Sequence, residues 1–153
     1  MDEPGGRRVI ASNRKARHEY EVLETFEAGL VLKGPEVKAV REGRVAFQDA
    51  FARVEGREVW LHSFHISPYE QANRFNEDPL RVRKLLLRRQ EIGRLSGKVE
   101  EKGLTLVPLD IYFRRGVAKI TLALARGRRL HDKREKLKRQ TQEREARRAM
   151  EAG

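Results

Sequence analysis

Two histidines have a spacing that could bind a metal ion. His62 and His65 flank Ser-Phe in the string HSFH. In a strand, however, residues three apart point to opposite faces of the sheet, so the two rings would not converge on one ion. The sequence also contains no cysteine, which excludes disulfides and thiolate metal ligands. We therefore expect no metal site.

A group of glutamates could in principle supply a general acid and a general base. Glu19, Glu21, Glu24 and Glu27 lie within nine residues of one another. Their positions also fit the solvent-exposed side of a strand, an interpretation that needs no shifted pKa. The sequence has no glycine-rich phosphate loop and no plausible nucleophile. We expect no catalytic residue and no cofactor, so a binding protein is a better interpretation than an RNA-modifying enzyme.

The basic residues point to the binding of phosphate groups. The 153-residue chain has 34 Lys and Arg against 23 Asp and Glu, a formal net charge of +11. Residues 126–153 hold 11 of the basic and 5 of the acidic residues, so less than a fifth of the chain carries more than half of the excess charge. This asymmetry predicts a nucleic acid as partner, because such binding depends largely on neutralising phosphates. An anionic membrane surface is the competing partner, but residues 126–153 have no Trp or Phe to insert into lipid.

The sequence shows no sign of export or of a membrane span. Its N-terminal stretch lacks the apolar run of a signal sequence, and no run of about 18 apolar residues occurs anywhere. We expect a cytoplasmic, monomeric protein with no membrane partner.

The elements that must position these residues are mainly strands. Alternating apolar residues predict strands from His18 to Gly34, a hairpin over 45–66 that turns at Gly56, and a strand pair over 104–125. In the last pair, one strand places Val107, Leu109, Ile111 and Phe113 on one face, and the other places Ala118, Ile120, Leu122 and Leu124 on the matching face. About six antiparallel strands with one apolar face predict a small β-barrel.

Two helices are predicted beside these strands. A short one follows Gly34-Pro35 and ends at Gly43. A long one begins at Asp78-Pro79 and ends at Gly103, with Leu86 at the edge of an apolar stripe. That stripe consists of Val82, Leu85, Ile92, Leu95 and Val99.

The chain divides into three parts on these patterns. Residues 1–8 are expected to be flexible, residues 9–125 to form the barrel, and residues 126–153 to form a basic tail. The tail has too few apolar residues to offset its ordering entropy, so we expect it to be disordered when free. It is nonetheless rich in helix-forming residues, and Glu135/Arg139 and Glu143/Arg147 have i,i+4 spacing.

Three strings give the sequence a resemblance to a known family. RKARHEY, DPLRVRKLLL and ARGRRLHDKRE, in this order, resemble the SmpB family, the partners of transfer-messenger RNA in the rescue of stalled bacterial ribosomes. The likeness runs from about Ile10 to about Arg139. One departure is minor, since members often have a bulkier residue and a serine where this chain has Pro35 and Ala39.

The resemblance implies an oligonucleotide-binding-type (OB-type) barrel and a mechanism. The barrel would bind the elbow of the tRNA-like domain of transfer-messenger RNA, and would support its aminoacylation and its delivery to stalled ribosomes. Alanyl-tRNA synthetase and elongation factor Tu are then indirect partners. The tail would enter the empty mRNA channel, contact small-subunit rRNA near the decoding centre and fold into a helix there.

The resemblance also assigns residues. Asn13, Glu27 and Leu86 match positions at the family's RNA-binding surface, and Glu27 would there accept a hydrogen bond from a base edge, a 2′-hydroxyl or a basic side chain. From the residues alone, Asn13 would be a turn former, Glu27 a solvated strand residue and Leu86 a core residue. We also expect contacts with this RNA from a set that could otherwise serve only solubility or the barrel: Arg14, Lys15, Arg17, Tyr20, Lys33, Lys84 and Arg88. Lys84 and Arg88 would lie one helical turn apart.

In the tail, the resemblance assigns the ribosome contacts. His131 matches a position that contacts small-subunit RNA, and Asp132, Lys133 and Arg134 match a signature needed for accommodation on the ribosome and not for binding the RNA. The full set expected in the decoding centre and mRNA channel is Arg126, Arg128, Arg129, His131, Asp132, Lys133, Arg134, Lys136, Lys138 and Arg139. The alternative interpretation is a general barrel-type RNA chaperone whose tail binds RNA without specificity.

Overall fold

The computed structural model describes residues 2–3, 6–68, 77–100, 103–128, 141–142 and 144–150. The strands are β1 (Asp2–Glu3), β2 (Arg7–Ser12), β3 (Tyr20–Leu30), β4 (Val45–Ala46), β5 (Phe51–Glu55), β6 (Glu58–His62), β7 (His65–Ile66), β8 (Arg83–Leu86), β9 (Leu104–Arg114) and β10 (Val117–Gly127). The helices with defined caps are α1 (Arg14–Glu19), α2 (Gly34–Arg41) and α3 (Arg89–Val99).

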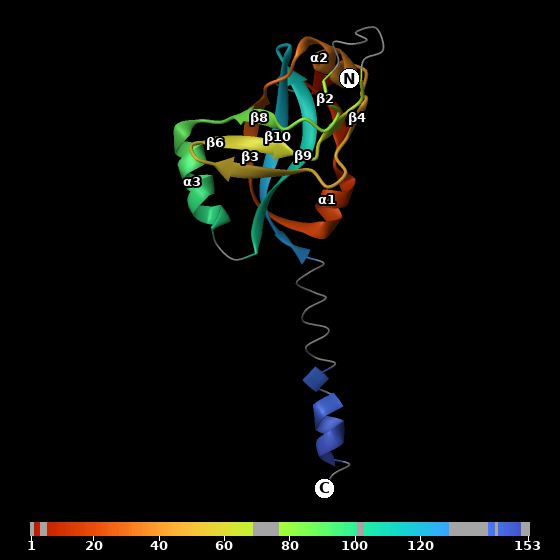
Figure 1. Cartoon of the computed structure of the whole chain (residues 1–153), viewed down its shortest axis with the longest axis vertical. Coiled ribbons are helices and arrows are strands. Elements are labelled where there is room, and N and C mark those ends of the chain that lie inside the picture. Colours follow the sequence, from red (N-terminus) through yellow and green to blue (C-terminus); the bar gives the residue numbers. More distant parts are fainter. Residues whose placement is uncertain are drawn as a thin grey trace.

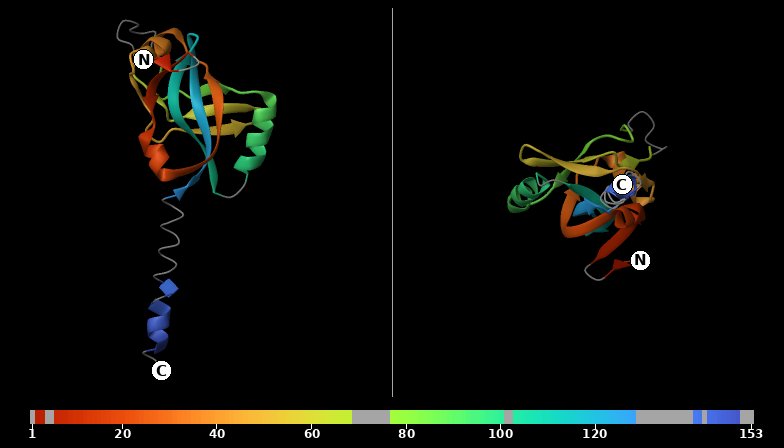
Figure 2. Two further views of the ribbon diagram at one scale, coloured as in Figure 1. Left: turned by 180° about the vertical axis from the view of Figure 1, so that it is seen from behind. Right: turned by 90° about the horizontal axis from the view of Figure 1, so that it is seen from below.

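Within the described ranges, six antiparallel strands close into a barrel (Figures 1 and 2). They follow one another in the order β9, β10, β3, β8, β6, β5, and Ala52 of β5 pairs back with Leu106 of β9. Strand β2 adds to the free edge of β9, with β1 beyond it, and β4 and β7 form a separate small ladder. The prediction of a small antiparallel barrel of about six strands is confirmed.

The apolar alternation of β10 is confirmed, whereas that of β9 is interrupted. Thr121 of β10 pairs with Asp110 and the next residue, Leu122, pairs with Pro108, so β9 has one extra residue at Leu109. This bulge reverses the alternation. Ile111 and Phe113 face the barrel core, but Val107 and Leu109 face a second apolar cluster that includes Ala16 of α1. We had expected these four β9 residues to share one face.

The long helix predicted over 78–103 is wrong in its first half. The side chain of Asp78 accepts a hydrogen bond from Leu80 N at 2.8 Å within a turn, and the chain then forms β8 between β3 and β6. Helix α3 begins only at Arg89, and Ile92, Leu95 and Val99 form its inward stripe as predicted. Sheet pairing outweighs local helix propensity here, because β8 supplies the ladder that joins β3 to β6.

The start of the chain also differs from expectation. Asp2–Glu3 and Arg7–Arg8, which we expected to be flexible, belong to strands. The free edge of β9 offers hydrogen bonds to Arg7–Arg8, and Asp2–Glu3 pair in turn with the outer edge of β2. Residues 14–19 form α1, so the strand that we predicted from His18 begins only at Tyr20. The predicted short helix after Gly34-Pro35 and the hairpin that turns at Gly56 are both confirmed.

Residues 141–142 and 144–150 of the tail are helical. Their side chains are exposed, so the helix matches the helix-forming composition and not packing against the body. We had expected no regular backbone in the tail without RNA, and the structure differs from that expectation in this stretch. An exposed helix this short is marginal in water, so ordering by RNA remains a prediction.

A buried ion cluster fixes α2 to the barrel. Arg83 is fully buried, and its Nε donates to Glu36 Oε2 at 2.6 Å. Its Nη1 donates to the carbonyl of Phe64 at 2.6 Å and its Nη2 to that of Pro79 at 3.1 Å. Glu36 also accepts from Arg81 Nη2 at 2.6 Å and from the backbone N of Lys33 at 2.9 Å.

This cluster predicts a loss of stability in acid. Burial would raise the pKa of Glu36, but hydrogen bonds from Arg81, the Lys33 backbone and Arg83, together with the charge of Arg83, hold this pKa below its usual 4.5. A carboxyl with a lowered folded-state pKa stabilises the protein above its unfolded pKa and loses that contribution as pH falls. We expect the free energy of unfolding to decline as pH falls from about 4.5. Urea unfolding of Glu36→Gln should show a shallower decline, and an equally steep one would exclude Glu36 as a cause.

Candidate nucleic-acid interface

Glu27 and Leu86 are brought together on the outside of the barrel. Along β3, Phe26, Ala28 and Leu30 point into the core, which leaves Glu27 and Gly29 on the outer side. Along β8, Leu85 points inward and Leu86 is 53% exposed. Leu86 pairs with Gly29 across the ladder, two residues from Glu27. We call the outer side of β2, β9, β10, β3 and β8 the outward face.

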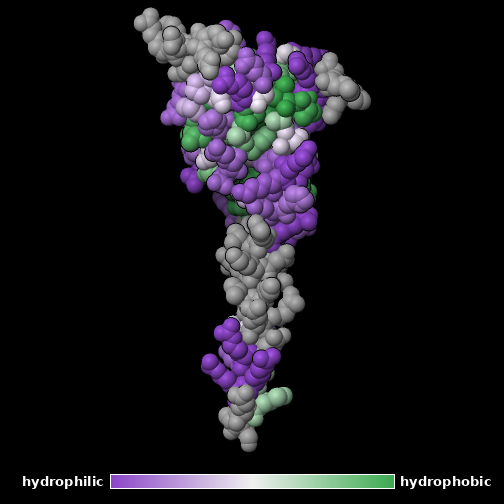
Figure 3. Space-filling model, turned by 90° about the vertical axis from the view of Figure 1, so that its right-hand side faces the viewer, coloured by the Kyte–Doolittle hydropathy of each residue, from purple (hydrophilic) through white to green (hydrophobic). Residues whose placement is uncertain are grey.

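Gly29 leaves space beside the Leu86 side chain, because glycine has no side chain of its own. A Cβ atom at this glycine would lie 3.4 Å from Leu86 Cβ, so a larger side chain would crowd the leucine. Val31 continues this exposed apolar strip, and its backbone N donates to the carbonyl of Lys84 at 3.0 Å. Figure 3 shows a different side of the body, the one away from α3, where apolar surface is also exposed among hydrophilic residues. An exposed apolar side chain beside basic ones suits contact with an unstacked base.

The carboxylate of Glu27 is held in position by two donors from β9. The hydroxyl of Tyr112 and Nη1 of Arg114, the latter at 2.6 Å, both donate to Glu27 Oε2. Burial of Tyr112, and then its hydrogen bond to Glu27, raise the pKa of this phenol above its ordinary value, so it remains a donor. Oε1 accepts no hydrogen bond from the described residues. A fixed carboxylate with one oxygen available can accept from a base or a 2′-hydroxyl.

More cations lie on this part of the outward face than the sequence predicted. The Arg7 guanidinium lies 4.0 Å from the centre of the Tyr112 ring, and its Nη2 donates to buried Asp110 at 2.9 Å. Arg17 Nη2 also lies near Asp110, 3.6 Å from its Oδ2. The sequence analysis missed Arg7 and Arg114. They are partners across the β2–β9 ladder, and no local motif shows such a pairing.

Asn13 is placed for structure. It is buried, and its Oδ1 accepts from Ala16 N at 3.1 Å, which caps α1. Its Nδ2 donates to the carbonyl of Pro108 at 2.9 Å, and its backbone N donates to that of Leu109 at 2.7 Å. With its amide groups engaged in this way, Asn13 positions α1, and thereby Arg17. Its direct contact with RNA remains a prediction.

The other predicted basic residues are spread over the body. Lys84 lies on β8 and Arg88 is the N-cap of α3, so the expected placement one helical turn apart is wrong, because the chain there is a strand. Lys15, Lys33 and Lys84 each have a carboxylate partner. A phosphate would have to compete with these carboxylates. Arg14 and Arg88 are exposed.

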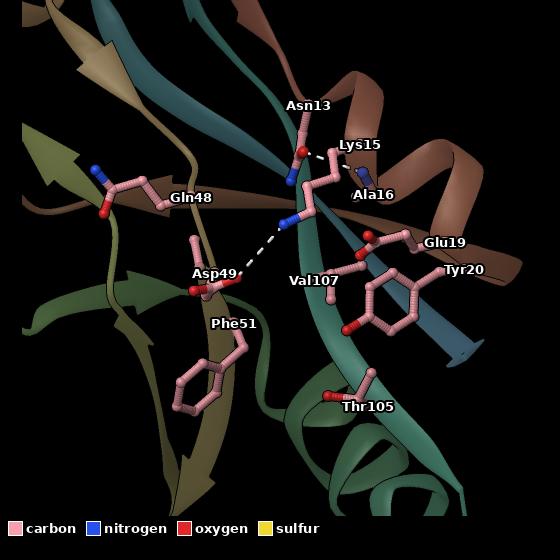
Figure 4. Close-up of a pocket in the computed structure, with 11 residues that line it drawn as sticks. Asn13, Lys15, Ala16, Glu19, Tyr20, Gln48, Asp49, Phe51, Thr105 and Val107 are labelled. Atoms are coloured by element: carbon pink, nitrogen blue, oxygen red, sulfur yellow. Dashed lines mark hydrogen bonds and ion pairs between the residues drawn. The ribbon is translucent and has the colours of Figure 1, made fainter. Parts of the chain in front are cut away.

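Tyr20 lies beside a pocket of about 210 Å³ between α1 and the segment before β5 (Figure 4). Its ring packs on the second apolar cluster, and across the ladder it pairs with Gly127, the last residue of β10. Its placement is that of a barrel residue. The predicted contact of Tyr20 with RNA is not tested by this geometry.

The tail set falls mostly outside the described residues. Arg126 is an exposed residue of β10, opposite Glu21, and Arg128 is exposed just beyond the strand. The other predicted tail contacts, from Arg129 to Arg139, lie outside the described ranges. In the part of the chain with described coordinates, no three potential metal ligands converge, and no helix has the length and apolarity to cross a membrane.

Comparisons with known proteins agree with this architecture. The SmpB protein family matches residues 10–152. The SsrA-binding protein of Geobacillus thermodenitrificans is 57% identical over 145 residues, which cover 95% of this chain and 94% of that protein. The SsrA-binding protein of Synechococcus elongatus is 54% identical over 151 residues, 98% of each chain. A chain of the solved structure "tmRNA-SmpB: a journey to the center of the bacterial ribosome" is 58% identical, with a TM-score of 0.66, over 76% of this chain and 82% of that one.

Proposed function

The chain belongs to the SmpB protein family, and on that premise we propose that it is an RNA-binding adaptor in ribosome rescue. It binds the tRNA-like domain of transfer-messenger RNA and acts with it on stalled ribosomes. The observation that carries this proposal is identity of 54–57% to SsrA-binding proteins along almost the whole chain.

The outward face supports RNA binding by the barrel. Leu86 offers an apolar contact to an unstacked base, and Glu27 offers one carboxylate oxygen to a base edge or a 2′-hydroxyl. Arg7, Arg17 and Arg114 keep this part of the surface positive around the carboxylates. Single-stranded loops of folded RNA, such as those at a tRNA elbow, present unstacked bases of this kind.

The tail supports a second role on the ribosome. We infer that it occupies the empty mRNA channel near the decoding centre, with His131 and the Asp132-Lys133-Arg134 signature in contact with small-subunit rRNA. The exposed helical turns at 144–150 show the helix-forming tendency that such ordering needs. Support of aminoacylation, and thus indirect cooperation with alanyl-tRNA synthetase and elongation factor Tu, belongs to the same proposal, as do monomeric action and a cytoplasmic location.

The proposal is tested by separating RNA binding from tagging. We expect a variant with Asp132, Lys133 and Arg134 all replaced by alanine to bind transfer-messenger RNA within about twofold of wild type, because the barrel makes those contacts. Tagging of peptides on ribosomes stalled without messenger should fall at least about tenfold, a loss of about 1.4 kcal/mol or more in the limiting step. Filter binding and a tagging assay measure the two effects.

Two further variants serve as controls. Replacing Glu145, Arg147 and Arg148 by alanine removes the same charges from the tail helix, and tagging should remain higher than in the signature variant. A truncation after Arg128 leaves β10 intact, and should retain RNA binding but lose tagging. If RNA affinity instead falls in proportion to the basic residues removed, the general chaperone is the better function.

A further inference from the structure

We propose that three arginines at the end of the barrel opposite the tail form a second site for RNA phosphates, and this proposal rests on the proposed function. Arg8 of β2, Arg41 at the end of α2 and Arg115 in the β9–β10 turn line a hollow of about 510 Å³. Phe113 lies in the same hollow, and the Arg41 guanidinium lies 5.8 Å from the centre of its ring. We call this site the arginine hollow.

The arginines of the hollow differ from the many described basic residues of the body that pair with a carboxylate, such as Arg44, Arg53 and Arg94. All three arginines of the hollow are exposed, and none forms an ion pair with a described side chain. The acidic residues nearest to them in sequence or register are Glu42, which lies 3.8 Å from Arg44, and Asp2, the Cα partner of Arg8. Three guanidinium groups from separate elements around a concave surface suit an anion with several acceptor oxygens, such as an RNA phosphate.

The backbone at Arg115 gives independent support. Arg115 has φ 52° and Gly116 has φ 77°, so both residues of this two-residue hairpin turn are left-handed. Such turns favour Asn-Gly, Asp-Gly or Gly-Gly, and a residue with a long side chain is disfavoured at the first position. An arginine held there at a conformational cost suggests a role for its charge.

The position of the hollow extends the reach of the protein along RNA. Figure 1 shows α2 and the N-terminal strands at one end of the barrel and the end of β10 at the other. Eleven residues of β10 separate the hollow from Gly127, about 35 Å at the rise of an antiparallel strand. The outward face lies between these ends. An RNA that is bound at the outward face can therefore also place phosphates at the arginine hollow.

The test compares two triple variants of the full chain. Arg8, Arg41 and Arg115 are replaced by glutamine in one, and Arg44, Arg53 and Arg94, which each have a glutamate partner, in the other. Binding to transfer-messenger RNA is measured over a series of salt concentrations. Each lost phosphate contact lowers the slope of log affinity against log salt by about 0.7 to 0.9, the values for single strands and for a B-form duplex. We expect a decrease of about 2 to 3 for the hollow variant and little change for the control.

A second assay identifies which RNA supplies the phosphates. Association of the RNA-bound variants with ribosomes is measured over the same salt series. A smaller slope only in this assay assigns the hollow to ribosomal RNA, and a smaller slope with transfer-messenger RNA alone assigns it to that partner. If both triple variants behave alike in both assays, the proposal is wrong.

Arg115→Asn separates the role of the charge from that of the fold. Asparagine suits the left-handed turn, so the variant should melt a few degrees higher while its salt slope falls by about 1. A higher melting temperature with an unchanged slope would exclude Arg115 from the site. A separate control tests the proposed function, which is wrong if the wild type binds a plain RNA duplex as tightly as transfer-messenger RNA. In that case, the salt dependence of duplex binding by the wild type and the hollow variant still tests the arginine hollow.

Discussion

Arg83→Ala should lower the free energy of unfolding by about 3–5 kcal/mol, the largest stability effect we expect from one substitution in this chain. The arginine has no exposed surface, and it donates to the Glu36 carboxylate and to the carbonyls of Phe64 and Pro79. Its removal leaves buried acceptors without a donor and weakens the compensation of the Glu36 charge. Urea unfolding at neutral pH measures the change.

Two controls separate this buried cluster from surface ion pairs. Arg53→Ala breaks an exposed pair of 3.9 Å with Glu55 and should cost less than about 1 kcal/mol. The double variant Glu36→Leu, Arg83→Met removes both buried charges, and should be more stable than Arg83→Ala alone. If Arg83→Ala cost no more than Arg53→Ala, the buried cluster would not hold α2 to the barrel.

This cluster also shows why the string DPLRVRKLLL misled the prediction of local structure. Asp78 before Pro79, followed by leucines and basic residues, has the features of a helix start. Here Asp78 instead closes a turn, and Arg81 and Arg83 reach Glu36, more than forty residues away. A contact over that separation leaves no periodic signal in the sequence, so only the tertiary structure reveals it.

Where neighbouring residues determined the outcome, the prediction succeeded. The alternation in β10 and the glycine turn at Gly56 determined those elements. Closure of the barrel, made here by the pairing of β5 with β9, was an expectation from the family resemblance. The β9 bulge was missed, because one extra residue at Leu109 has no sequence signal of its own. The candidate site was predicted only in part. Glu27 and Leu86 came from the family resemblance, whereas Arg7 and Arg114 required the β2–β9 register.

Leu86→Asp should weaken binding to transfer-messenger RNA about 100-fold, the largest effect on affinity we expect from one substitution. Contact of an apolar side chain with an unstacked base is worth about 1–3 kcal/mol, and a new carboxylate would also repel nearby phosphates. Leu86→Ala should cost about tenfold, since it removes contact without adding charge. Fluorescence anisotropy with labelled RNA measures both affinities.

The exposure of Leu86 makes this prediction separable from folding. Because the side chain is 53% exposed and points away from the core, both variants should melt within about 2 °C of wild type. Leu80, 48% exposed in the turn before β8, provides a matched control, and Leu80→Asp should bind RNA as the wild type does. Equal losses for Leu80→Asp and Leu86→Asp would indicate general charge repulsion. Wild-type binding by Leu86→Asp would show that the outward face beside Glu27 is not where the barrel holds its RNA.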